Sequence, residues 1–595
     1  MKKSNTSMLF LVLFIAAGVF MFGCAGSQPL SFVAGTYEGE AAGNNGPVRV
    51  AVTVSGDSIL DIKVLETKET PGIGSMAFDL IKNQIITHQS LAVDTVSGAT
   101  VSRAAYLTAI TEALKQSGSN IAVLQSRKIA APKPATIEYN TDIVIVGSGL
   151  AGTSAAVEAA SQGAKVIVVE MKDVFGGISI RARGMINAAG TQLQKQNGIV
   201  DTPEQMYNDW MAGAELAGDA FINPEMTRYL AYHSNENLEW VMAMGVPFRS
   251  NVDAPHSYPP FNARRVHQVV AFAEGVQSEA STMLTIMHEK ARSLGVQMYS
   301  GTRATEILMD NGKAAGIKAR GKNGDAITIH APVVVLCAGS ISGNRELMAK
   351  YFAKVAPYFE NRDIGSGDGF TMAEKAGAQM DVKLAMMGGT KGIEPGLLTI
   401  GTNPAELRIT PDGKRYIDEN AYASLRTDTM FKAGFGFDYA ILPPDIYKAH
   451  EQSLKEYSNT DKVFIANTVT DLAGQMGIQA NVLEATISRY NGLCDAKADR
   501  DFNKPAQFLV KIEAPFAAVK LGLSSNGTFV GPRINIDAQV LDTGGRPIPG
   551  LYAAGANAPA QTISLYMGSG SALINNITFG RQAARSGVKY IGLVQ

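Results

Sequence analysis

One segment, residues 141–170, constrains the fold of this chain more than any other part of the sequence. It reads TDIVIVGSGLAGTSAAVEAASQGAKVIVVE and predicts a buried strand, a helix and a second strand, at 142–146, 153–162 and 166–169. The turn between the first strand and the helix fits G-x-G-x-x-G, with Gly147, Gly149 and Gly152, and Glu170 follows the second strand. Such glycines allow a pyrophosphate to approach a helix N-terminus closely, and the acid can bind a ribose hydroxyl. The segment therefore predicts a Rossmann-like α/β domain that binds a dinucleotide.

Later glycine-rich segments indicate which dinucleotide is bound. They are FGGIS, VVVLCAGS, IGSGDGF, IPGLYAAGANAP and GSGSALINNITFG, at residues 175–179, 333–340, 364–370, 548–559 and 568–580. Segments this far apart that converge on one nucleotide fit a tightly held FAD better than an exchangeable NAD.

A short α+β unit precedes this domain. Residues 48–54 and 59–65 predict two strands, and residues 102–116 predict a helix. The motif DTVSGAT at 94–100 contains a bend, Gly98-Ala99, where backbone N–H groups at a helix start can receive phosphate oxygens. Thr100 offers a hydroxyl at that point, and the alternative is an ordinary helix N-cap.

The amino end has the features of an export signal. Lys2 and Lys3 precede an apolar run from Met8 to Gly23, which ends at Cys24. This run is short for a membrane span, which needs about 20 residues, so a cleaved secretory signal is expected over residues 1–23. The alternative is an uncleaved anchor helix. In both cases the folded part is expected outside the cytoplasm and tethered to a membrane.

Composition excludes several classes of function. With 53 basic and 54 acidic side chains, the charge balance gives no reason to expect nucleic acid as a partner. The three cysteines, Cys24, Cys337 and Cys494, form no disulfide framework, CxxC zinc site or CxxCH haem attachment, so no metal is expected. Prolines at 132 and 134 predict a stiffened linker over residues 118–137.

Three motifs in order, GTYEG at 35–39, ETPGIG at 69–74 and DTVSGAT, resemble the FMN-binding domain of bacterial respiratory flavoproteins. The resemblance implies such a domain at residues 33–117, with FMN joined covalently to Thr100 by a dedicated flavin transferase. The recognition residues that it implies are Asp94, Ser97 and Gly98. The segment MFGC at 21–24 resembles a bacterial lipobox, which implies a lipid anchor on Cys24 and a place on the extracytoplasmic face of the cell membrane.

The segments of the larger domain resemble the flavoprotein family of fumarate reductases, urocanate reductases and 3-ketosteroid dehydrogenases, over about residues 140–595. The implied fold is an FAD-binding Rossmann-like domain in two parts, 138–384 and 520–595, with an inserted α+β cap domain at 385–519. Substrate would lie between the cap and the flavin. The residues implied to line non-covalently bound FAD are Gly147, Gly149, Gly152, Glu170, Gly177, Ser179, Ala338, Gly339, Asp368, Gly369 and Gly555.

The positions that bind a dicarboxylate in fumarate reductases of this family carry no charge in this sequence. The resemblance places them at Gly388, Ala423 and residues 524–526 (SSN). Two carboxylates would lack cationic partners there, which argues against a doubly charged substrate. A loop region with His256, Arg264, Arg265 and His267 keeps a single carboxylate, and hence an enoate, open as an alternative.

Residues 566–570 (YMGSG) resemble the YPGxG segment of ketosteroid dehydrogenases, in which a tyrosine hydroxyl and a glycine N–H hold a ketone oxygen. The matching Tyr566 and Gly570 would form an oxyanion hole for the enolate that arises when hydride adds to an enone. The alternative is that Tyr566 packs against the flavin without catalytic contact. The expected proton donor is Tyr422, one residue before the family's catalytic position, with Arg426 as the second choice.

These expectations combine into one hypothesis. The protein is a flavin-dependent reductase of an activated C=C bond in a small alkene, an enone or an enoate, with electrons delivered through FMN by a membrane-linked donor in anaerobic respiration. One alternative is a urocanate- or fumarate-type reductase with a shifted active site. The other is an electron-relay lipoprotein without its own small-molecule substrate, against which a cap domain argues, because a relay needs no substrate enclosure.

Overall fold

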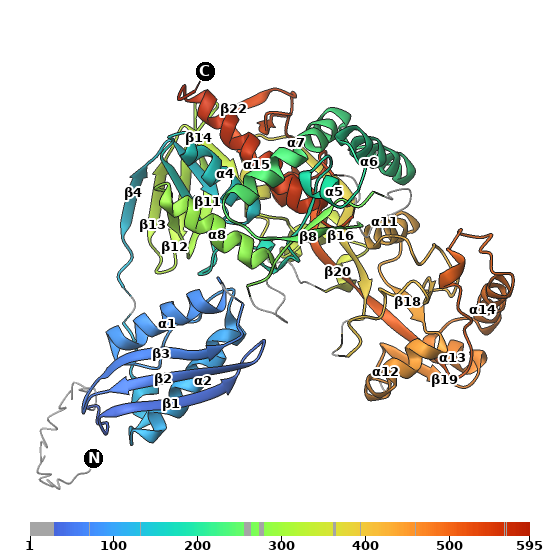
Figure 1. The fold of residues 1–595 in the computed structure, drawn as a ribbon, viewed down its shortest axis with the longest axis horizontal. Helices are drawn as coiled ribbons and strands as arrows, with labels where there is room; N and C mark the ends of the chain where they lie inside the picture. The colour runs from blue at the N-terminus through green and yellow to red at the C-terminus, as the bar shows by residue number, and fades with distance from the viewer. Residues whose placement is uncertain are drawn as a thin grey trace, which may run out of the picture.

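The computed structural model describes residues 29–70, 72–130, 132–254, 263–272, 279–360, 365–392, 394, 396–458, 460–563, 566 and 568–594. Figure 1 shows a small N-terminal domain, a larger central body and a lobe formed by residues of the predicted cap. The export signal predicted at 1–23 and the lipid-bearing Cys24 lie outside the described residues.

The N-terminal domain is an antiparallel three-stranded sheet packed against helices. Alternation of buried and accessible residues along the central strand turns Val48, Val50, Val52 and Val54 toward the helices. Helix α2 buries Tyr106 and Ile110 from its side of this core. The elements are β1 (Gly35–Ala42), β2 (Pro47–Val54), β3 (Ile59–Thr67), α1 (Gly74–His88), α2 (Thr100–Gln116) and α3 (Ile121–Ser126).

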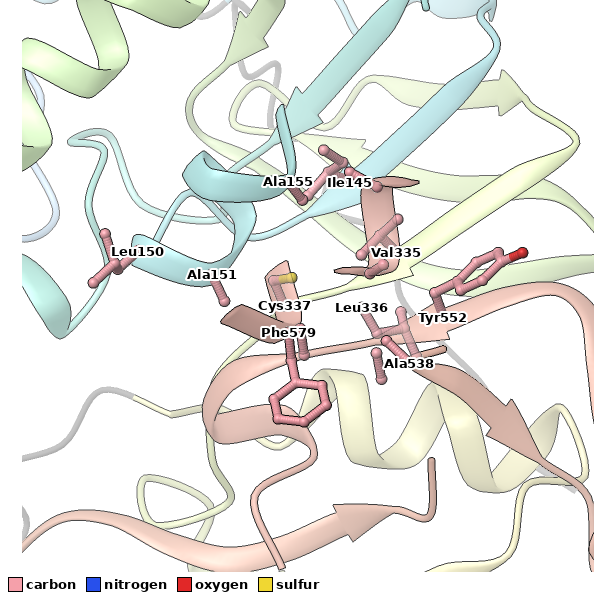
Figure 2. Packing of buried hydrophobic residues seen from close by; sticks show 14 of the residues in the cluster. Ile145, Leu150, Ala151, Ala155, Val335, Leu336, Cys337, Ala538, Tyr552 and Phe579 are labelled. Atoms are coloured by element: carbon pink, nitrogen blue, oxygen red, sulfur yellow. The ribbon is translucent and has the colours of Figure 1, made fainter. Parts of the chain in front are cut away.

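The central body is built on a six-stranded sheet whose order is β10-β6-β5-β14-β22-β21. Its first five strands are parallel, and only β21 at the edge is antiparallel. Side chains from β5, β14 and β22 meet those of α4 and α15 in one buried cluster (Figure 2). The elements are β5 (Ile143–Val146), α4 (Leu150–Ser161), β6 (Val166–Val169), α8 (Glu279–Ser293), β10 (Gln297–Tyr299), β14 (Val333–Leu336), β21 (Gln539–Leu541), β22 (Pro547–Ala553), η4 (Gly555–Asn557) and α15 (Ser571–Tyr590).

Two smaller sheets and several helices complete this body. One sheet has the order β11-β12-β13-β4, and the other has the order β7-β9-β8. Their elements are β4 (Thr136–Asn140), β11 (Thr302–Asp310), β12 (Lys313–Gly321), β13 (Ala326–His330), β7 (Met185–Asn187), β8 (Phe248–Asp253) and β9 (Val266–Val269). The remaining helices are η1 (Ser179–Arg181), α5 (Gln192–Gln196), α6 (Pro203–Ala217), α7 (Pro224–Ala243), α9 (Arg345–Tyr351), η2 (Ala356–Tyr358) and α10 (Asp368–Lys375).

A long pair of antiparallel strands, β16 and β20, joins the central body to the cap (Figure 1). In the cap, β18 and β19 both pair with β20, and helices cover this sheet. The elements are β15 (Phe359–Glu360), β16 (Met380–Lys391), β17 (Leu407–Ile409), α11 (Ala423–Ala433), β18 (Asp438–Ile441), α12 (Pro444–Glu456), β19 (Val463–Ala466), α13 (Val469–Met476), α14 (Ala480–Asp495), η3 (Ala506–Phe508) and β20 (Phe516–Pro532).

The structure refines the domain boundaries expected from sequence. The boundaries at 384/385 and 519/520 fall inside β16 and β20, because these strands run unbroken from the central body into the cap. The linker expected at 118–137 is partly ordered: α3 packs Leu124 into the N-terminal core, and β4 begins at Thr136. The free connection is therefore shorter than expected.

Within the described part of the chain, no helix has the length and apolar character needed to cross a bilayer. The same residues contain no group of three or more His, Cys, Asp or Glu side chains that could hold a metal ion.

Candidate flavin and substrate sites

A cavity opens at the carboxyl ends of β5, β6 and β14, beside the start of α4. It contains about 800 Å³ of empty space, part of it open to solvent. Of the residues predicted to line FAD, Gly147, Gly149, Glu170, Gly177, Ser179, Ala338, Gly339 and Asp368 line it. Eight distant sequence positions therefore converge at one edge of the sheet.

Three of the predicted residues do not line the cavity: Gly152, Gly369 and Gly555. Each allows segments of the chain to pack closely behind the cavity wall. A Cβ on Gly152 would lie 1.9 Å from the carbonyl oxygen of Gly147, so the turn and the helix could not approach. A Cβ on Gly369 would lie 1.9 Å from Oδ1 of Asn557. Gly555 has φ +71°, in the left-handed region, and faces Ala151.

The wall of the cavity fits a dinucleotide. At Gly147, φ is +103° and a Cβ would lie 2.3 Å from the carbonyl oxygen of Cys337, so the backbone itself forms the surface. The Glu170 carboxylate is held in place by the N–H and hydroxyl of Ser148, at 3.0 and 2.7 Å. A ribose hydroxyl can bind such a fixed carboxylate. These features match FAD binding at the N-terminus of α4.

Sequence reasoning missed Arg303, which also lines the cavity. Its guanidinium binds the Asp368 carboxylate through two hydrogen bonds, at 2.8 and 2.7 Å. Arg303 lies in β11, in a segment without a recognisable motif. Only the tertiary structure brings it to the nucleotide site.

The loop predicted to carry FMN ends at the start of α2. Thr100 is the first residue of this helix and is exposed, and Ala99 at the N-cap provides no side-chain cap for the free N–H groups of the first turn. Gly98 has φ +98°. An exposed hydroxyl beside uncapped N–H groups fits a phosphate ester. Asp94 is exposed, whereas Ser97 is half-buried and contacts the FAD-binding domain.

The substrate side of the site is formed where β16, β20 and α11 meet. Gly388 pairs with Ser525 across the two strands. A Cβ on Gly389 would lie 2.6 Å from Cβ of Ala423, the first residue of α11. The positions that the family resemblance assigned to dicarboxylate binding therefore come together, and their residue types are uncharged.

Two tyrosines from distant segments stack beside these positions. The rings of Tyr422 and Tyr566 lie 5.7 Å apart between centroids, with 15° between their planes. Burial raises the pKa of Tyr422 well above its usual value, an effect that the nearby Tyr566 increases and a hydrogen bond with Ser569 opposes. Burial also raises the pKa of Tyr566, and the backbone N–H of Gly570 partly offsets this. Both phenols are therefore neutral hydrogen-bond donors at physiological pH.

The turn that carries Tyr566 and Gly570 has an unusual backbone. Tyr566 has φ +54°, in the left-handed region, which is uncommon for a residue other than glycine. Gly570 has φ +95°, and a Cβ there would lie 2.8 Å from the backbone nitrogen of Asn187. Asn187, which sequence reasoning missed, donates from Nδ2 to the carbonyl of Ser569 at 3.1 Å and leaves Oδ1 buried without a partner. Its position at the end of β7 gave no signal in the sequence.

Arg426, the second candidate for the proton donor, lies behind Tyr422. It is buried and donates to the carbonyl oxygens of Glu419, Ala421 and Gly401, at 3.1, 2.9 and 3.0 Å. Burial lowers its pKa, and the neighbouring Arg408 lowers it further. These contacts hold the loop that ends in Tyr422, so the geometry favours Tyr422 over Arg426 as the group that meets a substrate.

Two of the four residues considered for a single carboxylate, Arg265 and His267, are buried and engaged with other side chains. Arg265 is buried and binds Asp201 through two hydrogen bonds of 2.7 Å and Asp209 at 2.6 Å. His267 is buried beside Thr191, at 2.9 Å, and burial lowers its pKa to about 4. Arg264 makes one long contact, 3.5 Å, with the carbonyl of Asn197, and His256 lies outside the described residues.

Comparison with known proteins agrees with this geometry. Residues 142–573 match the family model of the FAD binding domain, and residues 43–115 match that of the FMN-binding domain. The chain is 30% identical over 564 residues to urocanate reductase of Eggerthella lenta, covering 92% of this chain and 91% of that protein. It is 29% identical over 460 residues to fumarate reductase (cytochrome) of Shewanella frigidimarina, covering 76% and 77%.

A solved structure shares the fold of the central body and cap. The 3-ketosteroid-Δ4-(5α)-dehydrogenase from Rhodococcus jostii, in complex with 4-androstene-3,17-dione, aligns with a TM-score of 0.61 at 25% identity, over 77% of this chain and 99% of that one. The chain therefore belongs to the FAD-binding-domain family of flavoproteins, and it is an oxidoreductase with an FMN-binding domain ahead of its FAD-binding domain.

Proposed function

We propose that this protein reduces an activated C=C bond in a small enone or enoate, with Tyr566 and Gly570 holding the substrate oxygen and Tyr422 supplying the proton. The relatives named above reduce C=C bonds according to their names, urocanate and fumarate reductase, which supports this reaction class. FAD, when bound, supplies hydride to the β-carbon of the polarised alkene.

The observation that carries the proposal is the tyrosine pair at the meeting point of β16, β20 and α11. The backbone N–H of Gly570 is directed at the Tyr566 oxygen. In the proposal a substrate oxygen takes the place of that oxygen as the acceptor of the Gly570 N–H and also accepts from the Tyr566 hydroxyl. Neutral donors in a buried site stabilise the negative charge that develops on a carbonyl oxygen. Uncharged residues at Gly388 and Ala423 leave a second carboxylate without a cationic partner, so an acceptor with one carbonyl or carboxylate fits better than fumarate.

The proton must reach the α-carbon as hydride reaches the β-carbon. The ring of Tyr422 stacks on that of Tyr566, which supports a role for Tyr422 at the same substrate position. Since burial raises its pKa, the phenol keeps its proton until the substrate withdraws it. A proton then replaces it through the hydroxyl of Ser569 or from solvent.

The remaining parts of the proposal rest on the sequence. FMN is attached to Thr100 through a phosphoester by a flavin transferase that recognises Asp94, Ser97 and Gly98, and electrons arrive through it from a membrane-linked donor. Residues 1–23 direct export and Cys24 carries the lipid, so the protein works on the extracytoplasmic face of the cell membrane in anaerobic respiration. Mass spectrometry of the membrane-extracted protein tests both modifications directly.

The test of the reaction uses the protein without residues 1–24, made together with a flavin transferase. The flavins are reduced anaerobically, and their reoxidation is followed with fumarate, urocanate, cinnamate, an aliphatic enone and a 3-keto-4-ene steroid. We expect fast reoxidation by the enones or by the monocarboxylates urocanate and cinnamate, and slow reoxidation by fumarate. Fast reoxidation by fumarate would contradict the uncharged site, and silence across the panel would favour an electron relay.

A further inference from the structure

The loop that carries Thr100 is docked on the FAD-binding domain. Both the backbone N–H and the hydroxyl of Ser97 donate to Oδ2 of Asp173, at 2.7 and 2.9 Å, and the N–H of Asp173 approaches the Ser97 oxygen at 2.9 Å. Lys322 donates to the carbonyl of Thr95 at 3.1 Å and pairs with Oδ1 of Asp173 at 3.2 Å. Asp173 is buried, which strengthens its bonds to Ser97, whereas the Lys322 side chain that pairs with it is 38% exposed.

Apolar contacts surround this polar centre. Val174, next to Asp173, is buried in the hydrophobic cluster of the N-terminal domain. A Cβ on Gly98 would lie 2.6 Å from Cγ2 of Val174, so the loop approaches this closely only because residue 98 is glycine. Ile73 also packs against the cores of both domains.

The contact lies at the edge of the FAD cavity. Asp173 is three positions after Glu170, and the intervening Met171 and Lys172 line the cavity. The loop that ends in Thr100 therefore meets the protein segment that forms the nucleotide site. The chain passes from one domain to the other through the short connection before β4, which is outside this contact.

We propose that Ser97, Asp173 and Lys322 form a docking clamp that holds the FMN-bearing loop against the FAD-binding domain and so sets the rate of electron transfer between the flavins. This inference rests on the proposed attachment of FMN to Thr100. The transfer moves two electrons and two protons from reduced FMN to FAD, so FMN is reoxidised and FAD is reduced. Asp173 and Lys322 are positioning residues and take no part in the hydride or proton transfer to substrate.

The test changes only the FAD-domain side of the clamp, so that the flavin-attachment motif stays intact. The variant is Asp173→Ala with Lys322→Ala. The matched control is Glu306→Ala with Lys318→Ala. It removes an exposed ion pair of 3.0 Å between β11 and β12, the strand that ends just before Lys322. The first readout needs no flavin: small-angle X-ray scattering of the apoproteins, in which loss of docking increases the radius of gyration.

The second readout is the rate of FAD reduction in the loaded proteins by a reduced viologen, without any alkene. A Thr100→Val protein gives the rate of direct FAD reduction, which is subtracted. We expect the clamp variant to expand in solution and to transfer electrons at least about tenfold more slowly, with the control unchanged; tenfold corresponds to about 1.4 kcal/mol lost from docking. Flavin content is measured for each protein.

An unchanged radius of gyration overturns the clamp, as does an unchanged transfer rate in an expanded protein or an equal effect in the control. These outcomes are separate from failure of the proposed function. If FMN is not attached at Thr100, the Thr100→Val protein keeps the flavin content of the parent, while the scattering comparison still tests docking. If the protein reduces no alkene, the inter-flavin rate is still measured, because no acceptor is used.

Discussion

Replacing Tyr566 with phenylalanine removes one hydroxyl from the candidate oxyanion site and leaves the aromatic ring in place. The ring keeps its stacking partner Tyr422, 5.7 Å away between centroids, and phenylalanine fills the same space. Tyrosine and phenylalanine must both adopt the same backbone conformation at position 566, with φ +54°, so the substitution adds no backbone strain. The variant is therefore expected to fold, with a change in stability of about 1 kcal/mol or less.

The expected effect on catalysis is much larger. Loss of one preorganised donor to an oxyanion costs about 10²–10³ in kcat, which is about 3–4 kcal/mol of transition-state stabilisation. The N–H of Gly570 remains, so activity should fall by that factor and not vanish. Because the substrate carbonyl carries less charge than the enolate, KM should change little by comparison.

The assay is anaerobic reoxidation of the reduced flavins by the best acceptor of the panel, measured as kcat and KM. Tyr439→Phe is the matched control, since Tyr439 is a buried tyrosine of the cap sheet, away from the tyrosine pair. Thermal unfolding of both variants checks that they fold. A Tyr566→Phe protein with the kcat of the parent would refute the oxyanion role and leave Tyr566 as a packing residue.

Four further results are expected. Thr100→Val should abolish flavin that survives denaturation, seen as loss of in-gel fluorescence; persistence would place FMN elsewhere. Gly152→Ala should bind FAD at least about tenfold more weakly, because its Cβ would lie 1.9 Å from the Gly147 oxygen. Purification of this variant with its full content of FAD would contradict the expectation. Burial raises the pKa of the Glu406 carboxyl to about 7 from 4.5, so the folded protein binds this proton more tightly than the unfolded chain does. The contribution of Glu406 to the free energy of unfolding should be fully present below about pH 4.5 and fall by about 3 kcal/mol toward pH 7. Glu406→Gln should remove this fall in thermal unfolding, and an unchanged pH dependence of stability in the variant would refute it. Because burial raises the pKa of Tyr422, its ionisation should not lower kcat at any pH up to about 9. A fall in kcat between neutral pH and about pH 9 that is absent in Tyr422→Phe would contradict a neutral donor.

Local sequence rules predicted the nucleotide-binding part of the molecule. The strand, turn, helix and strand at 142–169 are β5, α4 and β6, because two short, fully buried apolar runs and the fixed glycine spacing between them leave a βαβ unit few other conformations. The strands and the helix of the N-terminal domain were also placed within a few residues. Both cofactor domains follow from such short-range patterns, and the family comparisons confirm them.

The local motifs, whose chemistry needs residues only a few positions apart, could therefore be predicted from the amino-acid sequence alone. The stacking of Tyr422 on Tyr566, the part of Asn187 in anchoring the turn and the pairing of Arg303 with Asp368 were decided by the tertiary structure. The docking of Ser97 on Asp173 belongs to the same group. These contacts join segments tens to hundreds of residues apart, and no local propensity encodes them, because their free energy depends on the packing of whole domains.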